Sequence, residues 1–84
     1  MFAINRYNKH LVIATNNIMA MEAVTQFIYR VFPGVAYFIE IETFPNMTLY
    51  RIYIKSDAKY DRKLANLIRE DLEARHITLI EEES

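Results

Sequence analysis

Two alternating stretches decide the fold of this chain: Val35–Thr43 (VAYFIEIET) and Thr48–Lys55 (TLYRIYIK), joined by the segment FPNM. In both stretches, aromatic and β-branched residues alternate with charged or polar ones, which is the pattern of a β-strand with two different faces. Pro45 and Asn46 are typical turn residues. We therefore predict an antiparallel hairpin that turns at Pro45-Asn46.

The register of this hairpin follows from the even length of its loop, which keeps residues of one kind on one face. One face then carries Tyr37, Ile39, Ile41, Tyr50, Ile52 and Ile54, and the other pairs Glu40 with Arg51, Phe38 with Tyr53 and Glu42 with Leu49. An ion pair and an aromatic pair meet across the strands without adjustment. Such pairs stabilise antiparallel sheets, so they support this register.

A helix is predicted between the N-terminal segment and the hairpin. Asn16 or Asn17 can serve as its N-cap, because an asparagine side chain accepts a hydrogen bond from a free backbone N–H. The helix should run to about Phe32, where Pro33 ends it and Gly34 can supply a positive φ.

The surface of this first helix is unusually apolar. Glu22, Gln26 and Arg30 form a narrow polar stripe at a spacing of four residues, and the apolar arc covers more than half the circumference. A helix that packs on a sheet needs a narrower apolar stripe. The residues that extend the apolar surface are Met19, Met21, Ala23 and Phe27. This additional apolar surface of the helix either packs against the N-terminal segment and the second helix or contacts another chain.

A second helix is predicted over residues 58–76, capped by Ser56 or Asp57. Its apolar stripe consists of Tyr60, Leu64, Leu67, Ile68 and Leu72. Asp71 and Arg75 are spaced for an exposed ion pair, and His76 would lie at the C-terminal end as a cation. Ile77–Ile80 is expected to form a short last strand.

The N-terminal segment Phe2–Thr15 has two readings. It forms one long strand with a bulge, or a hairpin that turns at Asn8-Lys9. In the hairpin, Ile4 faces Ile13 and Phe2 faces Thr15, which is a sensible pairing of apolar residues. The residues alone do not choose between them.

The resulting element order is β-α-β-β-α-β, with an extra N-terminal strand if the first segment is a hairpin. This order predicts an α+β fold of the ferredoxin-like kind, an antiparallel sheet with two helices on one face. The fold would occupy residues 1–80 as a single domain, because 84 residues suffice for one domain only. Residues 81–84 would form an acidic tail.

Composition excludes several classes of function. The chain has no cysteine, which removes disulfides and thiolate metal sites. Its net charge of −1 lacks the basic excess that is usual for proteins that bind phosphate backbones. The longest apolar run near the start, Leu11–Ala14, is too short for a signal peptide or a membrane span. We therefore expect a cytoplasmic protein with no membrane contact.

No catalytic or cofactor motif is visible. There is one glycine, so phosphate-binding glycine loops cannot form. Ser56 fits a helix cap, and no nucleophile motif surrounds it or Ser84. His10 is interpreted as a turn residue, and neither it nor His76 has the spacing of a metal site. We predict a protein that is not an enzyme and needs no cofactor or metal.

The predicted hairpin leaves one face that the two helices would not cover. The candidate binding residues on it are Phe38, Glu40, Arg51, Tyr53 and Lys55. Aromatic and arginine side chains are frequent anchors at protein interfaces. The favoured hypothesis is a small protein-binding module that contacts a partner protein or forms a homodimer. Regulators, accessory subunits and inhibitors, including those encoded by phages or mobile elements, are proteins of this size.

Two other functions remain as alternatives. The same aromatic residues could stack on single-stranded nucleic acid, as in RNA-recognition-motif domains. Thr48–Lys55 lacks the glycine-and-aromatic pattern of that motif, however, and Glu40 and Glu42 would repel phosphate. A small dimeric enzyme is the third hypothesis. It would need a polar cleft near His10.

Overall fold

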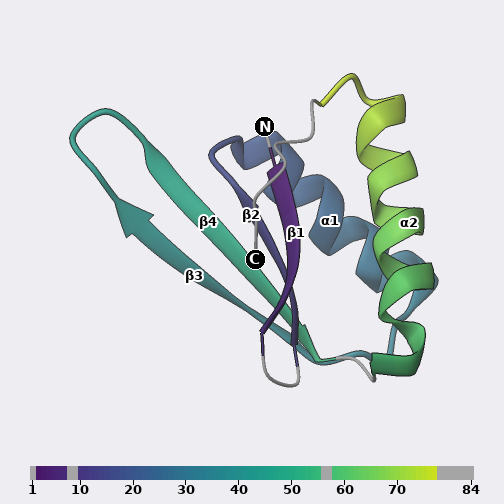
Figure 1. Cartoon of the computed structure of the whole chain (residues 1–84). Helices are drawn as coiled ribbons and strands as arrows, with labels where there is room; N and C mark the ends of the chain where they lie inside the picture. The colour runs from purple at the N-terminus through teal and green to yellow at the C-terminus, as the bar shows by residue number, and fades with distance from the viewer. Residues whose placement is uncertain (1, 8–9, 56–57, 78–84) are drawn as a thin grey trace.

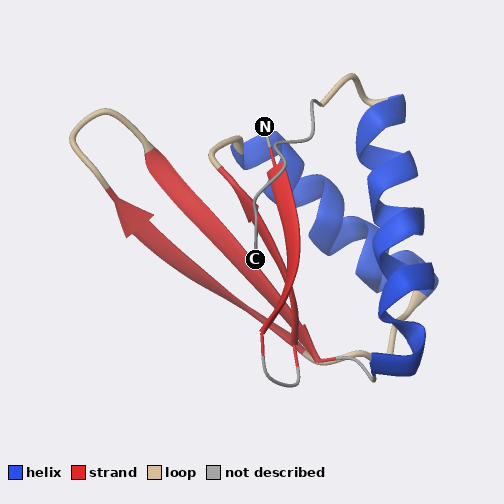
Figure 2. Cartoon of the chain, viewed as in Figure 1, coloured by secondary structure: helices blue, strands red, loops and turns tan. Residues whose placement is uncertain are grey.

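The computed structural model describes residues 2–7, 10–55 and 58–77. They form an α+β fold with one antiparallel sheet and two helices. The elements in chain order are β1 (Phe2–Tyr7), β2 (His10–Thr15), α1 (Ile18–Val31), β3 (Tyr37–Thr43), β4 (Thr48–Lys55) and α2 (Ala58–Ala74). The sheet has four strands in the order β1-β2-β4-β3, and both helices lie on one side of it (Figures 1 and 2).

The hairpin of β3 and β4 has the predicted register. Phe38 lies opposite Tyr53, Glu40 opposite Arg51, and Glu42 opposite Leu49. At its turn, the N–H of Phe44 donates to the carbonyl of Met47 at 2.8 Å. The alternating pattern of the two strands was therefore sufficient to fix their pairing.

The N-terminal segment is a hairpin and not one long strand. Phe2 lies opposite Thr15, and Ile4 lies opposite Ile13, as the hairpin alternative requires. β2 then pairs antiparallel with β4, which makes it an inner strand of the sheet. The expected turn at residues 8 and 9 lies outside the described residues.

Helix α1 begins with two side-chain hydrogen bonds. The Oγ1 of Thr15 accepts the N–H of Asn17 at 3.1 Å, and the Oδ1 of Asn17 accepts the N–H of Met19 at 2.9 Å. Of the two asparagines considered, Asn17 is therefore the N-cap. The helix ends at Val31, as expected before Pro33, but the expected positive φ at Gly34 is wrong. The chain leaves this helix without a left-handed residue.

Helix α2 ends in a left-handed turn made by a histidine. His76 has a φ of 61°, its N–H donates to the carbonyl of Glu73, and the N–H of Ile77 donates to the carbonyl of Leu72. This is the Schellman arrangement, in which glycine is the usual residue. The predicted pair of Asp71 and Arg75 is confirmed at 3.1 Å.

Several predictions around α2 fall outside the described residues. They concern the cap at Ser56 or Asp57, the side chain of Tyr60, and the acidic tail. Of the predicted last strand, only Ile77 is described, and it is not in a strand. The complete ferredoxin-like order is therefore not confirmed. The described order ends at α2.

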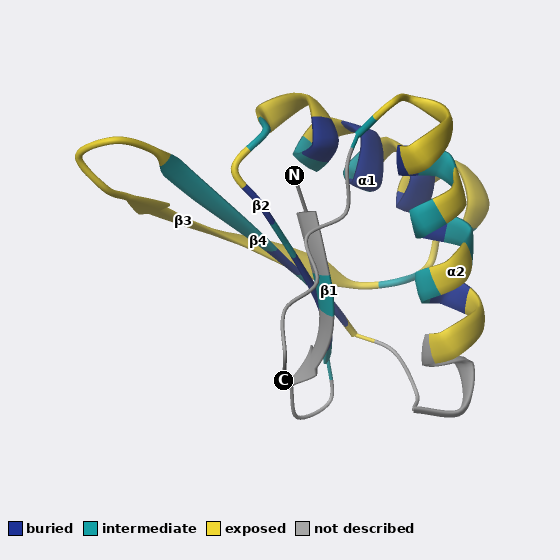
Figure 3. Cartoon of the chain, turned by 45° about the horizontal axis from the view of Figure 1, so that its top comes forward, coloured by how far each residue is buried: buried dark blue, intermediate teal, exposed yellow. Residues whose placement is uncertain are grey.

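The core lies between the helices and the middle of the sheet. It consists of Leu11, Ile13, Ala20, Ala23, Val24, Phe27, Ile28, Ile52, Ile54, Leu64, Ile68 and Leu72. The hairpin of β3 and β4 extends away from the helices (Figure 1), and β3 is exposed along its whole length (Figure 3). Tyr37, Ile39 and Ile41 on its helix side are 42%, 36% and 60% exposed. The helical layer is too small to cover the whole sheet.

Candidate functional site

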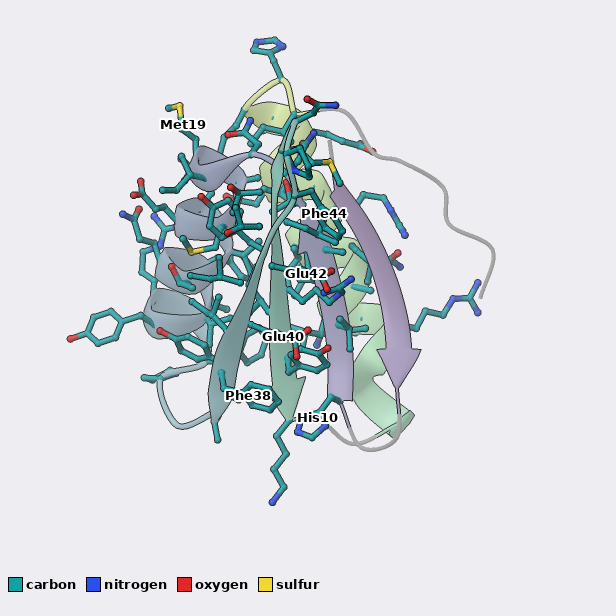
Figure 4. The ribbon with its side chains drawn as sticks, turned by 90° about the vertical axis from the view of Figure 1, so that its left-hand side faces the viewer. His10, Met19, Phe38, Glu40, Glu42 and Phe44 are labelled. Atoms are coloured by element: carbon teal, nitrogen blue, oxygen red, sulfur yellow. The ribbon has the colours of Figure 1, made fainter. Side chains whose placement is uncertain are left out.

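The five predicted binding residues share the face of the sheet that lies opposite the helices. Phe38 and Glu40 come from β3, and Arg51, Tyr53 and Lys55 come from β4. Figure 4 looks onto this open face. Phe38, Glu40 and Glu42 follow one another along β3, with Phe44 at the turn. Strand alternation brings all five side chains to one side.

Three aromatic rings form a cluster at one end of the open face. Phe38 and Tyr53 are stacked, with ring centroids 4.6 Å apart and planes 8° from parallel. The ring of His10 meets both edge-on, at 5.5 Å from Phe38 and 6.0 Å from Tyr53. Edge-to-face and offset stacked geometries are the favourable ones for aromatic rings. Phe38 is still 53% exposed, so the cluster presents an apolar surface to solvent.

Two carboxylates bind one guanidinium beside this aromatic cluster. Nη1 of Arg51 contacts Oε1 of Glu40 at 3.1 Å, and Nη2 contacts Oε1 of Glu42 at 3.2 Å. The hydroxyl of Tyr53 donates to the same oxygen of Glu40 at 3.4 Å. Partial burial opposes the charge of Arg51, but the hydrogen bonds and charges of Glu42 and Glu40 outweigh it, so the pKa of Arg51 is raised. The guanidinium is held in place and is always charged.

The remaining side chains of the open face are mostly apolar. Val12 is buried and Ala14 is half-buried on β2, between β4 and β1, and Leu49 is half-buried on β4 opposite Glu42. Lys55 is exposed at the edge of the aromatic cluster, opposite His10 in the register. The face therefore has an apolar floor, an aromatic end and a fixed charge in its middle. This is the composition of many protein interfaces.

Two residues of this face were missed or misread in the sequence. His10 was expected in a turn but is the first residue of β2, which places it against Phe38 and Tyr53. The pairing of β2 with β4 joins distant parts of the chain, and no local sequence pattern predicts it. Glu42 was expected only as the partner of Leu49. Its carboxylate reaches diagonally to Arg51, a common contact between neighbouring pairs in a sheet.

The apolar surplus of α1 is smaller than the sequence suggested. Ala23 and Phe27 are buried in the core, and Met21 is partly buried against it. Met19 alone of the four expected residues is strongly exposed, at 70% (Figure 4). The core therefore uses most of the broad apolar arc. Exposed large apolar side chains remain at the two ends of this helix, at Ile18, Met19, Tyr29 and Val31, and along β3.

Within residues 10–55 and the described part of α2, no three His, Asp or Glu side chains are placed to hold a metal ion. Neither helix has the length and apolar character needed to cross a membrane. Comparison of the chain with family models, with curated proteins and with solved structures found no match.

Proposed function

We propose that this protein is a non-enzymatic protein-binding module of the cytoplasm, which acts by occupying a surface of a partner protein. The open sheet face is its binding surface, with Phe38, Tyr53 and Arg51 as the anchors. The observation that carries the proposal is the pre-assembled cluster of three rings beside a doubly paired arginine. Side chains that are already fixed lose little conformational entropy when a partner binds.

The charges of the face favour a protein over a nucleic acid. Arg51 is bound by Glu40 and Glu42, so these three groups together carry a net charge of −1. Binding to a phosphate backbone needs cations that are free to replace counterions. Among the described side chains of this face, Lys55 is the one strong base that remains. A partner with an apolar surface and a basic group near Glu42 fits this pattern better.

The enzyme hypothesis receives less support. The ring of His10 packs edge-on against Phe38 and Tyr53 on the open face of the sheet. Thr15 is the one buried polar side chain among the residues whose burial is described, and it accepts the N–H of Asn17. A catalytic acid or base usually needs a perturbed environment, and the space between helices and sheet is apolar.

The proposal is tested by capture of partners from the native host. Tagged protein should retain a specific partner that is lost with Phe38→Asp and with Tyr53→Asp, because each places a charge in the aromatic cluster. Glu73→Lys on the exposed side of α2 is the matched control and should retain the partner. An unchanged set of partners for all three variants would refute the binding surface. Salt-sensitive binding of single-stranded RNA that is lost in Tyr53→Ala would instead favour the nucleic-acid function.

The ferredoxin-like architecture is part of the same proposal. It requires residues 77–80 to add a last strand to the sheet. Since β2 and β4 are inner strands, such a strand would add to the outer edge of β1. The chain order β2-α1-β3-β4-α2 matches the first five elements of this architecture, but β1 occupies the side of β2 where its last strand would lie.

A further inference from the structure

Strand β3 is an edge strand with apolar side chains on its helix side. In the described sheet it pairs with β4 alone, so one side of its backbone has no strand beside it. Natural edge strands are usually short, charged on both faces or covered, because a bare edge pairs with other chains. β3 has seven residues and carries Tyr37, Ile39 and Ile41 on its helix side. This edge is therefore suited to pairing with another strand.

The hydrogen bonds of the hairpin show which backbone groups point outward from this edge. The N–H of Lys55 donates to the carbonyl of Ala36, and the N–H of Phe44 donates to the carbonyl of Met47. In an antiparallel pair, every second residue directs both its N–H and its C=O to the partner strand. The even-numbered residues from 36 to 44 thus face β4. The free groups belong to Tyr37, Ile39, Ile41 and Thr43.

We propose that the occupant of this edge is a second copy of the same chain, with the two β3 strands paired antiparallel around a two-fold axis at Ile39. Such an axis is perpendicular to the sheet and keeps the helices of both copies on one side. Ile39 then lies opposite Ile39 of the second copy, and Tyr37 lies opposite its Ile41. These are residues whose backbone groups point outward, so the hydrogen bonds of both strands are satisfied.

The charges of β3 exclude the two symmetric registers nearer to its C-terminal end, and an axis at Phe38 would pair only residues 37–39 of the strand. If the axis lies at Glu40, two glutamates face each other directly. If it lies at Ile41, Glu40 of each copy faces Glu42 of the other. Like charges directly opposite each other destabilise a sheet. With the axis at Ile39, Glu40 faces Phe38, and Glu42 faces Ala36, so no like charges meet.

The surface next to this edge also fits a second copy. An open groove lies between α1 and the start of β3, lined by Thr25, Gln26, Tyr29, Arg30 and Tyr37. In the proposed register, Ile41 of the second copy lies beside Tyr37 and thus at this groove. Ile41 and Tyr29 are 60% and 80% exposed in the single chain. In a two-fold contact the same patch of both copies is buried, so Ile41 and Tyr29 of each copy would become covered.

The dimer would join two four-stranded sheets into one continuous sheet. Both open faces would then lie side by side, because the two-fold axis preserves the face of each copy. The proposed partner-binding surface is thereby doubled and not blocked. The dimer would form through the edge and the helix side of β3, whereas a partner would bind the open face. A failure of one proposal therefore leaves the other untouched.

Disulfide cross-linking tests the register, and the absence of cysteine makes each introduced cysteine unique. Ile39→Cys should form a covalent dimer on mild oxidation, because facing Cα atoms of a hydrogen-bonded pair lie about 5.5 Å apart, within disulfide range. Ile41→Cys is the matched control and should stay monomeric under denaturing conditions. In the proposed register the two introduced cysteines at position 41 would be offset by four residues along the strands. At about 3.4 Å per residue this separates them by about 14 Å, which is too far for a disulfide.

The contrary outcomes are equally specific. Cross-linking of Ile41→Cys but not of Ile39→Cys would place the axis at Ile41 and overturn the proposed register. If the two variants are mixed and only the mixed dimer, joined from position 39 to position 41, becomes cross-linked, the two-fold axis would lie at Glu40. Cross-linking of neither, with a sedimentation mass that stays at the monomer value of 10.0 kDa at all concentrations, would overturn the dimer. Ile39→Lys should convert a dimer to that mass, whereas Tyr53→Asp should leave the dimer intact.

Discussion

Removing the stacked rings tests whether the aromatic cluster is pre-assembled in the free protein. Full burial of a phenylalanine contributes about 1.5–3 kcal/mol, and Phe38 is about half exposed, so Phe38→Ala should lower the free energy of unfolding by about 1 kcal/mol. A stacked cross-strand pair adds a coupling of about 0.5 kcal/mol beyond the buried area. For 84 residues the entropy of unfolding is about 0.18 kcal/mol/K, so the single variant should lose about 6 °C in Tm.

The coupling is measured by a double-mutant cycle with Phe38→Ala and Tyr53→Ala, using urea unfolding followed by circular dichroism. The cost of the double variant should be less than the sum of the single costs by about 0.5 kcal/mol. A matched cycle with Phe38→Ala and Tyr29→Ala should be additive, because Tyr29 is on α1 and 80% exposed. Additivity in both cycles would contradict the stacking and the argument that the binding face is pre-formed.

Three further predictions concern the ends of the helices and the ion pairs. His76→Gly should raise Tm by about 3–6 °C. The left-handed conformation costs a non-glycine residue about 1–2 kcal/mol, and the greater conformational freedom of glycine in the unfolded chain offsets part of the stability gained by removing that cost. A lower Tm would contradict the left-handed turn. Asn17→Ala should cost about 1 kcal/mol in urea unfolding, through loss of the cap to Met19, and no change would show that another group caps α1. Arg51→Met should cost at most about 1 kcal/mol at low salt, and the cost should shrink in 1 M NaCl; a large cost at high salt would contradict an ion pair that is open to solvent.

The local features of the fold could be read from the sequence because they depend on neighbouring residues. The alternation in Val35–Thr43 and Thr48–Lys55 fixes which side chains share a face, and the even loop fixes their partners. The helix start was narrowed to Asn16 or Asn17, and the end before Pro33 follows from the missing N–H of proline. The five candidate residues could be placed on one face for the same reason, and their role in binding stays a prediction.

The features that were missed depend on contacts between distant parts of the chain. His10 belongs to the aromatic cluster only because β2 pairs with β4, and two segments this far apart give no local signal of pairing. The exposure of Ile39 and Ile41 depends on how far the two helices reach across the sheet, which the alternation of a strand does not encode. The left-handed His76 was missed because glycine is the residue by which such a turn is recognised.

Photo-cross-linking in cells of the native host tests the open face as a binding surface most directly. A photoreactive phenylalanine analogue in place of Phe38 preserves an aromatic ring at the exposed end of the cluster, and the same analogue in place of Glu73 on α2 is the control. We predict that the variant at position 38 forms a covalent adduct with one distinct protein and that the variant at position 73 does not. Adducts that are equal at both positions, or an adduct with nucleic acid at position 38, would contradict the proposed function.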